Sequence, residues 1–179
     1  MEVEWKAFEL HPGIPPEGQP VPWPPELRAE RGENFRRLAD EAGLPHGERT
    51  HWFDSEPAHE ACEWAREHGT EEAFRHKIYD AYFVKNINIG SPDVLAEIAE
   101  SLGLDSQDLR AALADGRYRE SVQRQFAEAR QVGVTGVPTF MAGGYAIVGA
   151  QPYSMFERLM EVVEQPRHAD AGAGGSSPA

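Results

Sequence analysis

The sequence has little with which to cross-link itself or to bind a metal through thiolates. Its 179 residues include one cysteine, Cys62, so no disulfide can form within the chain and no zinc site with several cysteine ligands is available. No run approaches the roughly 20 consecutive apolar residues that a membrane-spanning helix needs. The opening residues, MEVEWKAFEL, have neither the basic nor the apolar region of a signal peptide. We therefore expect a cytoplasmic protein without a membrane partner, stabilised by packing.

Positive charge is also scarce. The 17 lysines and arginines face 30 aspartates and glutamates, which gives a net charge of −13 with histidine neutral. Such a field repels phosphate backbones, so nucleic acid is not expected as a partner. A composition that is 40% apolar and 26% charged is typical of a globular chain. The length favours one core with one inserted subdomain over two independent domains.

Two contrasting segments open the chain. Residues 2–10 alternate apolar and charged side chains and then shift phase at Phe8, which predicts a strand with a bulge. The segment that follows carries seven prolines between Pro12 and Pro25. Proline fixes φ and removes a hydrogen-bond donor, so this segment is predicted to be an extended surface loop.

The middle of the chain has helical periodicity. Apolar spacing and capping residues predict six helices: from Glu33 to Gly43, from Ser55 to Gly69, after Thr70, from Ser91 to Gly103, from Asp105 to Ala114, and from Tyr118 to Gln131. The period then changes. Residues 137–142 and 145–148 predict a hairpin around Gly143-Gly144. A last helix is expected from Pro152 to Pro166, before a disordered tail.

The segment GVTGVPTF, residues 133–140, is the most informative. A proline that opens a strand is tolerated at a sheet edge or in a special turn. An ordinary trans proline at the start of a strand is one interpretation. A cis Val137-Pro138 bond is the other, and it would turn the backbone groups of Val137 outward, where an extended peptide could pair with them. The local pattern leaves both open.

Three segments together resemble one family: EVEWKAFELHPGIPPEG, NIGSPDVLAEIAESLGLD and GVTGVPTFMAGGYAIVGAQP. In this order they are similar to the FrnE-type branch of the DsbA-like thioredoxin-fold oxidoreductases. The resemblance implies an α/β, thioredoxin-like fold with an inserted all-helical subdomain. It assigns residues 1–32 and 116–165 to the thioredoxin-like part and residues 33–115 to the helical insertion, with residues 166–179 as the tail.

The resemblance also implies roles for the residues around the proline. Val137-Pro138 would be the cis-proline loop, with Pro138 facing the reactive thiol and Val137 pairing with the substrate backbone. Thr139 would enter the strand beneath. The substrates would be disulfides of proteins or small thiols, exchanged by a thiolate whose pKa is lowered at a helix N-terminus, without a cofactor.

That reaction uses a Cys-x-x-Cys pair, which this sequence lacks. In the family the pair follows a strand that precedes the segment like EVEWKAFEL, and that strand is central in the sheet. Burying its four or five apolar side chains would contribute about 10 kcal/mol, comparable with the stability of a whole domain. We therefore expect the gene product to begin upstream of Met1, with a truncated sheet in the chain as it stands. A pseudoenzyme with a repacked sheet, or a homodimer completed by strand addition, are the alternatives.

Two other functions stay open. The related 2-hydroxychromene-2-carboxylate isomerases and kappa glutathione transferases share the cis-proline and use glutathione. Their binding segment usually carries a Ser-Asp pair where this chain has Ala150-Gln151-Pro152, which favours the oxidoreductase. A peptide-binding module without redox chemistry is the third interpretation.

The remaining chemical side chains are interpreted as structural. Cys62 lies on a helix face of alanines and is expected to be a packed, unreactive thiol. Glu56-x-x-His59 matches half of a bundle metal site, but no second half is present, so no metal is expected. His51 and Trp23 are expected to anchor loops. No glycine-rich segment lies between a strand and a helix, so no nucleotide site is expected.

Overall fold

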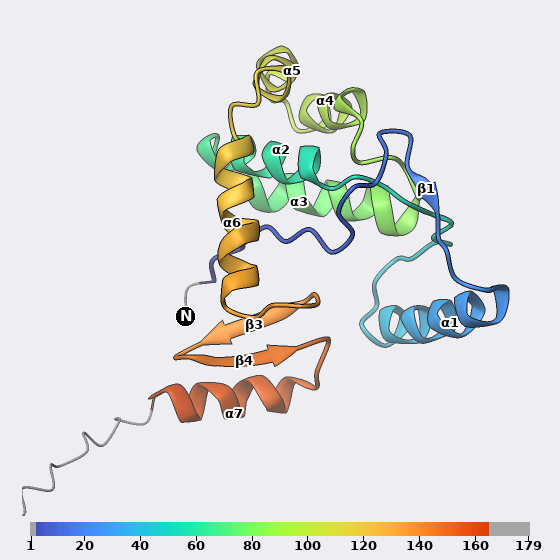
Figure 1. The fold of residues 1–179 in the computed structure, drawn as a ribbon, viewed down its shortest axis with the longest axis vertical. Coiled ribbons are helices and arrows are strands. Elements are labelled where there is room, and N and C mark those ends of the chain that lie inside the picture. The colour runs from blue at the N-terminus through green and yellow to red at the C-terminus, as the bar shows by residue number, and fades with distance from the viewer. Residues whose placement is uncertain (1–2, 165–179) are drawn as a thin grey trace, which may run out of the picture. The chain divides into compact units, whose positions relative to one another are not determined.

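A computed structural model describes residues 3–164 of the chain (Figure 1). Over this range the chain forms seven α-helices, one π-helical turn and four short strands. Contacts divide the chain into two units, Met1–Gly133 and Val134–Ala179. These units are defined by contacts and do not test the boundaries at residues 33 and 115, which stay a prediction. None of the helices in the described range is long and apolar enough to cross a membrane.

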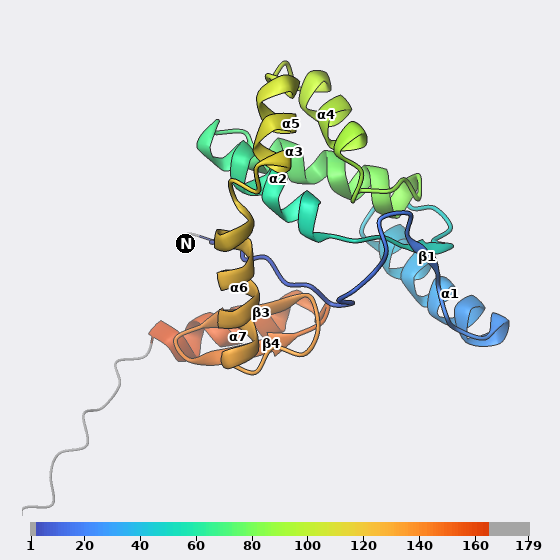
Figure 2. The ribbon, with the colours of Figure 1, turned by 45° about the horizontal axis from the view of Figure 1, so that its top comes forward.

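The first unit is a helical body. Figures 1 and 2 show α2 and α3 side by side, with α4 and α5 packed on them. Besides the first helix, α1 (Pro25–Glu41), its helices are α2 (Glu56–Glu67), α3 (Glu71–Tyr79), α4 (Pro92–Ser101), α5 (Ser106–Ala114) and α6 (Arg119–Gln131). Trp64, Phe74, Leu95 and Leu109 fill its core and are fully buried. Five of the six predicted helices are thus confirmed in this body.

The starts of these helices follow from local chemistry. Pro57 and Pro92 stand in the first turns of α2 and α4, where a missing N–H costs nothing. Asp105 caps α5, since its side chain accepts hydrogen bonds from the backbone N–H groups of Gln107 and Asp108. Thr70 does not cap α3, because its hydroxyl donates instead to the Ala65 carbonyl.

The first helix begins earlier than the sequence predicted. α1 spans Pro25–Glu41, whereas the apolar spacing placed its start at Glu33. Pro25 fixes the φ of the first turn, and the residues after it include good helix formers, so the helix starts without an apolar face. Only Ala39 is buried within it. The prolines before it form the predicted loop, broken by a two-residue strand, β1 (Gln19–Pro20), that pairs with β2 (His51–Trp52).

The strand predicted for residues 2–10 is wrong for the part that the structure describes. Residues 3–10 have no strand conformation, because no neighbouring strand pairs with them within the described range. Side chains hold the segment instead. The Ala7 N–H donates to Gln125 Oε1 at 2.8 Å, Arg66 donates to the Trp5 carbonyl at 3.3 Å, and the Arg75 guanidinium lies 4.1 Å from the Trp5 ring centroid.

A π-helical turn, Asp80–Val84, continues α3 and was not predicted. Its width shows in the hydrogen bond from the Lys85 N–H to the carbonyl of Asp80, five residues earlier, at 3.1 Å. The turn leaves the carbonyl of Phe83 available, and Gly47 N–H donates to it at 3.0 Å. The loop before β2 is therefore attached to the end of this helix.

Carboxylates along one face of α2 contact polar side chains of α6 and of Tyr118, the residue just before it. Four pairs form along it: Glu56 with Gln123, Glu60 with Arg119, Glu63 with Gln125, and Glu67 with the Tyr118 hydroxyl. Glu60 is the most buried member, at 2% exposed, and its Oε2 has no hydrogen-bond partner among the described residues. Burial raises the pKa of the Glu60 carboxyl, although the Arg119 guanidinium, 3.4 Å away, opposes this.

Glu60→Gln is expected to stabilise the protein at neutral pH. Because folding raises the pKa of Glu60, this group favours folding most below the ordinary pKa of 4.5 and loses that contribution as pH rises through the raised value. Glutamine carries no charge at either pH. Urea unfolding at pH 4 and pH 7.5 should therefore show the variant gaining on the wild type as pH rises. Glu120→Gln, on an exposed side chain, is the control; an equal effect of Glu60→Gln at both pH values would contradict the prediction.

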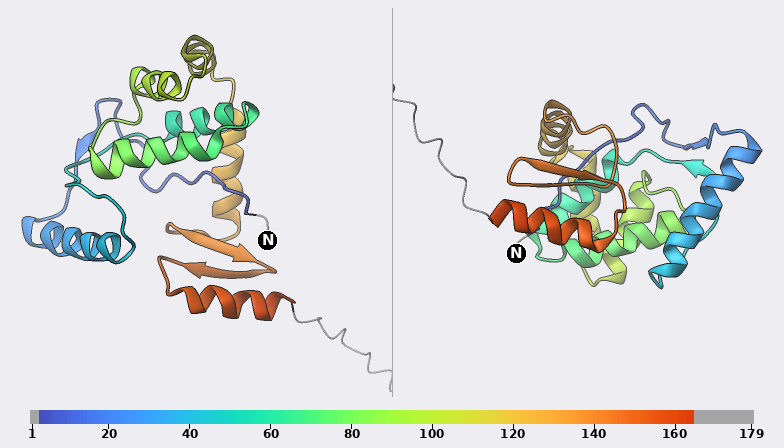
Figure 3. Two further views of the ribbon diagram at one scale, coloured as in Figure 1. Left: turned by 180° about the vertical axis from the view of Figure 1, so that it is seen from behind. Right: turned by 90° about the horizontal axis from the view of Figure 1, so that it is seen from below.

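The second unit is described for residues 134–164. β3 (Thr139–Ala142) and β4 (Tyr145–Val148) form the predicted antiparallel hairpin, with Phe140 opposite Ile147. α7 (Tyr153–Glu164) lies alongside the hairpin (Figure 3), and Phe156 meets Phe140 with ring centroids 4.8 Å apart. Met141 and Val148, on the other face of the hairpin, are more than half exposed. The predicted tail, residues 166–179, lies outside the described residues.

Candidate functional site

The site predicted from the sequence is a short turn at the entrance to β3. The Val137-Pro138 peptide bond is cis. The Thr139 hydroxyl donates to the carbonyl of Gly136 at 2.6 Å, which closes the turn on one side of the proline. On the other side, the Gly149 N–H donates to the Pro138 carbonyl at 2.8 Å. The turn is therefore attached to the residue that follows β4.

Val137 is the accessible residue of this turn. Its side chain is 49% exposed. Neither its N–H nor its carbonyl has a hydrogen-bond partner within residues 3–164, and the pairing of β3 with β4 begins one residue after Pro138. A residue with two unused backbone groups at the edge of a hairpin can accept an extended peptide. The three residues predicted as the site, Val137, Pro138 and Thr139, lie together in this turn.

Cys62 is placed away from any arrangement that would activate a thiol. It lies within α2, packed against the core of the first unit. Burial raises the pKa of its thiol to about 12, and the nearby arginines, Arg75 and Arg66, only partly oppose the shift. The expected role as a packed thiol agrees with this placement.

Native Cys62 is expected to resist thiol reagents. Burial raises the pKa of its thiol to about 12 and the side chain packs against the core, so reaction with a disulfide reagent at pH 8 should be at least about tenfold slower than that of free cysteine. The measurement is the rate of thionitrobenzoate release at pH 8. Unfolding in urea should release one equivalent rapidly, which serves as the control. A native rate equal to that of free cysteine would show that the thiol is exposed and activated.

The histidine of the sequence pattern Glu56-x-x-His59 has structural partners. Its ring meets the Phe126 ring edge-on, with centroids 5.6 Å apart, and bonds to the backbone of Phe8. Burial lowers the pKa of His59 to about 4, so the ring is neutral at physiological pH. No three histidine, cysteine or carboxylate side chains in the described range are close enough to hold a metal ion.

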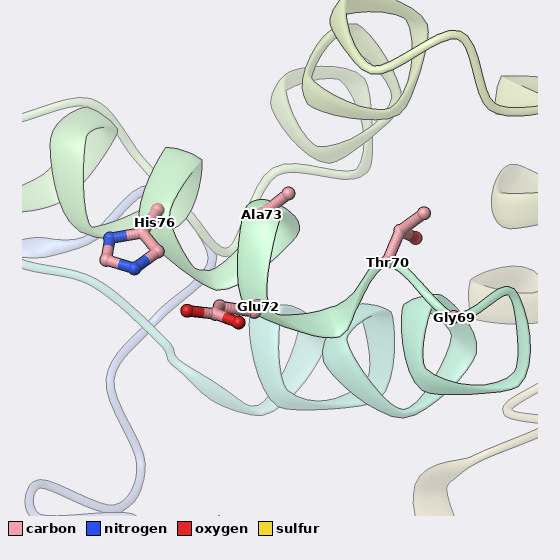
Figure 4. A pocket seen from close by; sticks show the side chains of 5 residues that line it. All are labelled: Gly69, Thr70, Glu72, Ala73 and His76. Atoms are coloured by element: carbon pink, nitrogen blue, oxygen red, sulfur yellow. The ribbon is translucent and has the colours of Figure 1, made fainter.

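A shallow hollow of the first unit lies elsewhere. It has a volume of about 440 Å³ and opens at the turn between α2 and α3 (Figure 4). Gly69, Thr70, Glu72, Ala73 and His76 line it. None of the predicted site residues is among them, and the lining residues form no nucleophile and base pair.

Two features were not predicted from the sequence: one hydrogen bond of the turn, and a cluster of side chains elsewhere in the chain. The bond from Gly149 to Pro138 depends on the hairpin register, which sequence patterns do not specify to a single residue. The cluster joins Arg31 and Arg49 on the Trp23 ring. Only the isolated tryptophan among prolines could have indicated it.

Comparisons with known proteins place this geometry in a family. The chain matches the DSBA-like thioredoxin domain over residues 1–161. It is 31% identical over 165 residues to the uncharacterized protein YwbO of Bacillus subtilis, covering 89% of this chain and 81% of that protein.

Two solved structures extend the comparison. A probable DsbA oxidoreductase from Streptomyces coelicolor is 29% identical, with a TM-score of 0.81 over 97% of this chain and 83% of that chain. A 2-hydroxychromene-2-carboxylate isomerase is 20% identical, with a TM-score of 0.64 over 75% of this chain and 66% of that chain, and shares the fold. The chain therefore belongs to the DsbA-like thioredoxin domain family and has its α/β, thioredoxin-like fold.

Proposed function

We propose that this chain is the larger part of a thiol–disulfide oxidoreductase of the FrnE type. The observation that carries the proposal is Val137, which is half exposed and whose backbone N–H and carbonyl have no hydrogen-bond partner within residues 3–164. An extended stretch of a substrate protein would pair with these two groups. The cystine of that substrate would then lie next to Pro138.

The chemistry needs a thiolate that the described chain does not supply. A nucleophilic thiolate attacks one sulfur of the substrate disulfide and forms a mixed disulfide, while the other substrate sulfur leaves as a thiolate and takes up a proton. A second cysteine then attacks the mixed disulfide, becomes oxidised with the first, and releases the reduced substrate. Cys62 is partly buried against the core and its thiol has a raised pKa, so it performs neither step.

We infer that a segment before Met1 carries both cysteines and a strand. Two unpaired stretches support this inference. β3 has β4 on one side and no strand on its other side within the described residues. Residues 3–10 have no pairing strand either, and Val3 and Leu10 are 60% and 43% exposed. A strand from a preceding segment would pair with the free backbone groups of such a stretch and cover its apolar side chains.

The experiment compares the 179-residue chain with the product of the longer reading frame. The longer product should contain a Cys-x-x-Cys motif and should reduce insulin disulfides in the presence of dithiothreitol. Changing its first cysteine to serine should remove the activity, and the 179-residue chain should have none. An in-frame stop codon immediately before Met1 would refute the inference.

The same preparations separate the alternatives. Glutathione binding by the longer product without insulin reduction would favour the isomerase or transferase chemistry. A dimeric mass of the 179-residue chain in size-exclusion chromatography would favour completion of the sheet by a second copy. Peptide binding at Val137 without any redox activity would favour a binding module.

A further inference from the structure

The proline-rich loop holds a cluster of aromatic rings against β2. His11 stacks on Trp52, with ring centroids 3.7 Å apart and an angle of 13° between the rings. Trp23 meets Trp52 edge-on at 5.8 Å. The pairing of Gln19 with Trp52 and the bond from the Val21 N–H to the Thr50 carbonyl fix the loop to β2. Backbone hydrogen bonds between the proline-rich loop and β2 therefore hold the aromatic rings together.

Two arginines from different segments converge on the Trp23 ring. Arg31, from α1, places its guanidinium carbon 4.6 Å from the ring centroid, and Arg49, from the loop before β2, lies 6.0 Å from it. Arg49 also lowers the pKa of His11, although burial is the larger cause. Two like charges thus share one aromatic surface.

These two arginines have no carboxylate partner among the described residues. Eight other arginines there form ion pairs within 4.0 Å: Arg37, Arg66, Arg75, Arg110, Arg117, Arg119, Arg124 and Arg130. Arg49 shares a hydrogen bond with the side chain of Tyr82, and Arg31 has only the ring contact. A guanidinium has five N–H donors, and those in its plane stay available when its face rests on a ring.

We propose that Arg31, Arg49 and Trp23 form a binding site for a carboxylate of a peptide. The planar guanidinium matches a carboxylate through two parallel hydrogen bonds, and two cations on one ring attract the same anion. A polyphosphate is disfavoured, because the net charge of −13 repels a multiply charged anion more than a single carboxylate.

The test measures fluorescence anisotropy of a hexapeptide amide, Gly-Ser-Glu-Phe-Glu-Gly, labelled with a neutral dye, at low ionic strength. The full chain should bind it, and the peptide with both glutamates replaced by glutamine should bind at least about tenfold more weakly. The double variant Arg31→Gln/Arg49→Gln should show a similar loss. Arg28→Gln/Arg36→Gln, which removes the same charge from exposed residues without an aromatic contact, should bind as the wild type does.

A second variant tests the proposal even if the glutamine variant folds poorly. Arg31→Lys/Arg49→Lys retains the charge but loses the planar fork, and it should also bind more weakly. Far-ultraviolet circular dichroism confirms folding of each variant. Equal binding of the glutamine peptide, or equal losses in the two glutamine variants, would overturn the proposal. Stronger competition by inorganic phosphate than by acetate at equal ionic strength would overturn the assignment of a carboxylate.

Discussion

Replacing Trp64 with alanine is expected to lower the free energy of unfolding by about 3–5 kcal/mol. Trp64 is fully buried in the core of the first unit. Its ring packs against Phe74 and His68, with centroids 6.3 Å and 4.3 Å away. Its indole N–H donates to Asp108 Oδ2 at 2.6 Å, a bond that helps to lower the pKa of that carboxyl. The substitution removes both the packing and this donor.

Urea unfolding followed by circular dichroism at 222 nm measures the loss. Trp64→Phe keeps an aromatic ring but no donor, so it should fall between the wild type and Trp64→Ala. Leu44→Ala, at a side chain that is 61% exposed, is the matched surface control and should change stability by less than about 0.5 kcal/mol. If Trp64→Ala cost no more than Leu44→Ala, the helical core described above would be wrong.

Gly47→Ala should also destabilise the protein, by about 1–3 kcal/mol or more. A Cβ at this position would lie 1.9 Å from the carbonyl oxygen of Val84 and 2.8 Å from its carbonyl carbon. Both atoms belong to backbone, which cannot rotate away as a side chain could. Relief of the clash would break the bond from the Gly47 N–H to the Phe83 carbonyl. The loop would then separate from the π-helical turn.

Gly32→Ala makes the same chemical change, but it is expected to raise the stability of the protein. Gly32 lies within α1, and an added Cβ would have only ordinary contact with the Arg36 side chain at 3.4 Å. Alanine is better than glycine inside a helix by about 0.5–1 kcal/mol. In thermal unfolding, the melting temperature of Gly32→Ala should therefore lie above that of the wild type, and that of Gly47→Ala below it. A raised melting temperature for Gly47→Ala would contradict the close approach of the loop.

Local patterns predicted most of the helical body because its helices start and end on local signals. Pro57, Pro92 and Asp105 mark three starts that the structure places within a residue of the prediction. The Gly143-Gly144 turn likewise predicted the hairpin. Glycine and proline act through their own backbone restrictions, which do not depend on the rest of the fold.

The misses share a dependence on distant contacts. The alternation in residues 3–10 predicts a strand only if a second strand supplies hydrogen bonds, and the described chain supplies none there. The start of α1 carries no apolar face, so periodicity could not find it. The convergence of Arg31 and Arg49 depends on how the loop folds over β2. Of the candidate site, the turn at Val137 was accessible to sequence reasoning mainly through resemblance to a family.

The number of residues in the π-helical turn determines where the Arg49 guanidinium lies. Its wide hydrogen bonding frees the Phe83 carbonyl for Gly47, and Arg49 follows Gly47 by two positions. Deleting a residue between Asp80 and Val84 would restore ordinary α-helical pairing, withdraw that carbonyl and release the base of the loop. Length variants of this helix would therefore move the Arg49 guanidinium without changing its chemistry, something that no substitution at Arg49 itself can do.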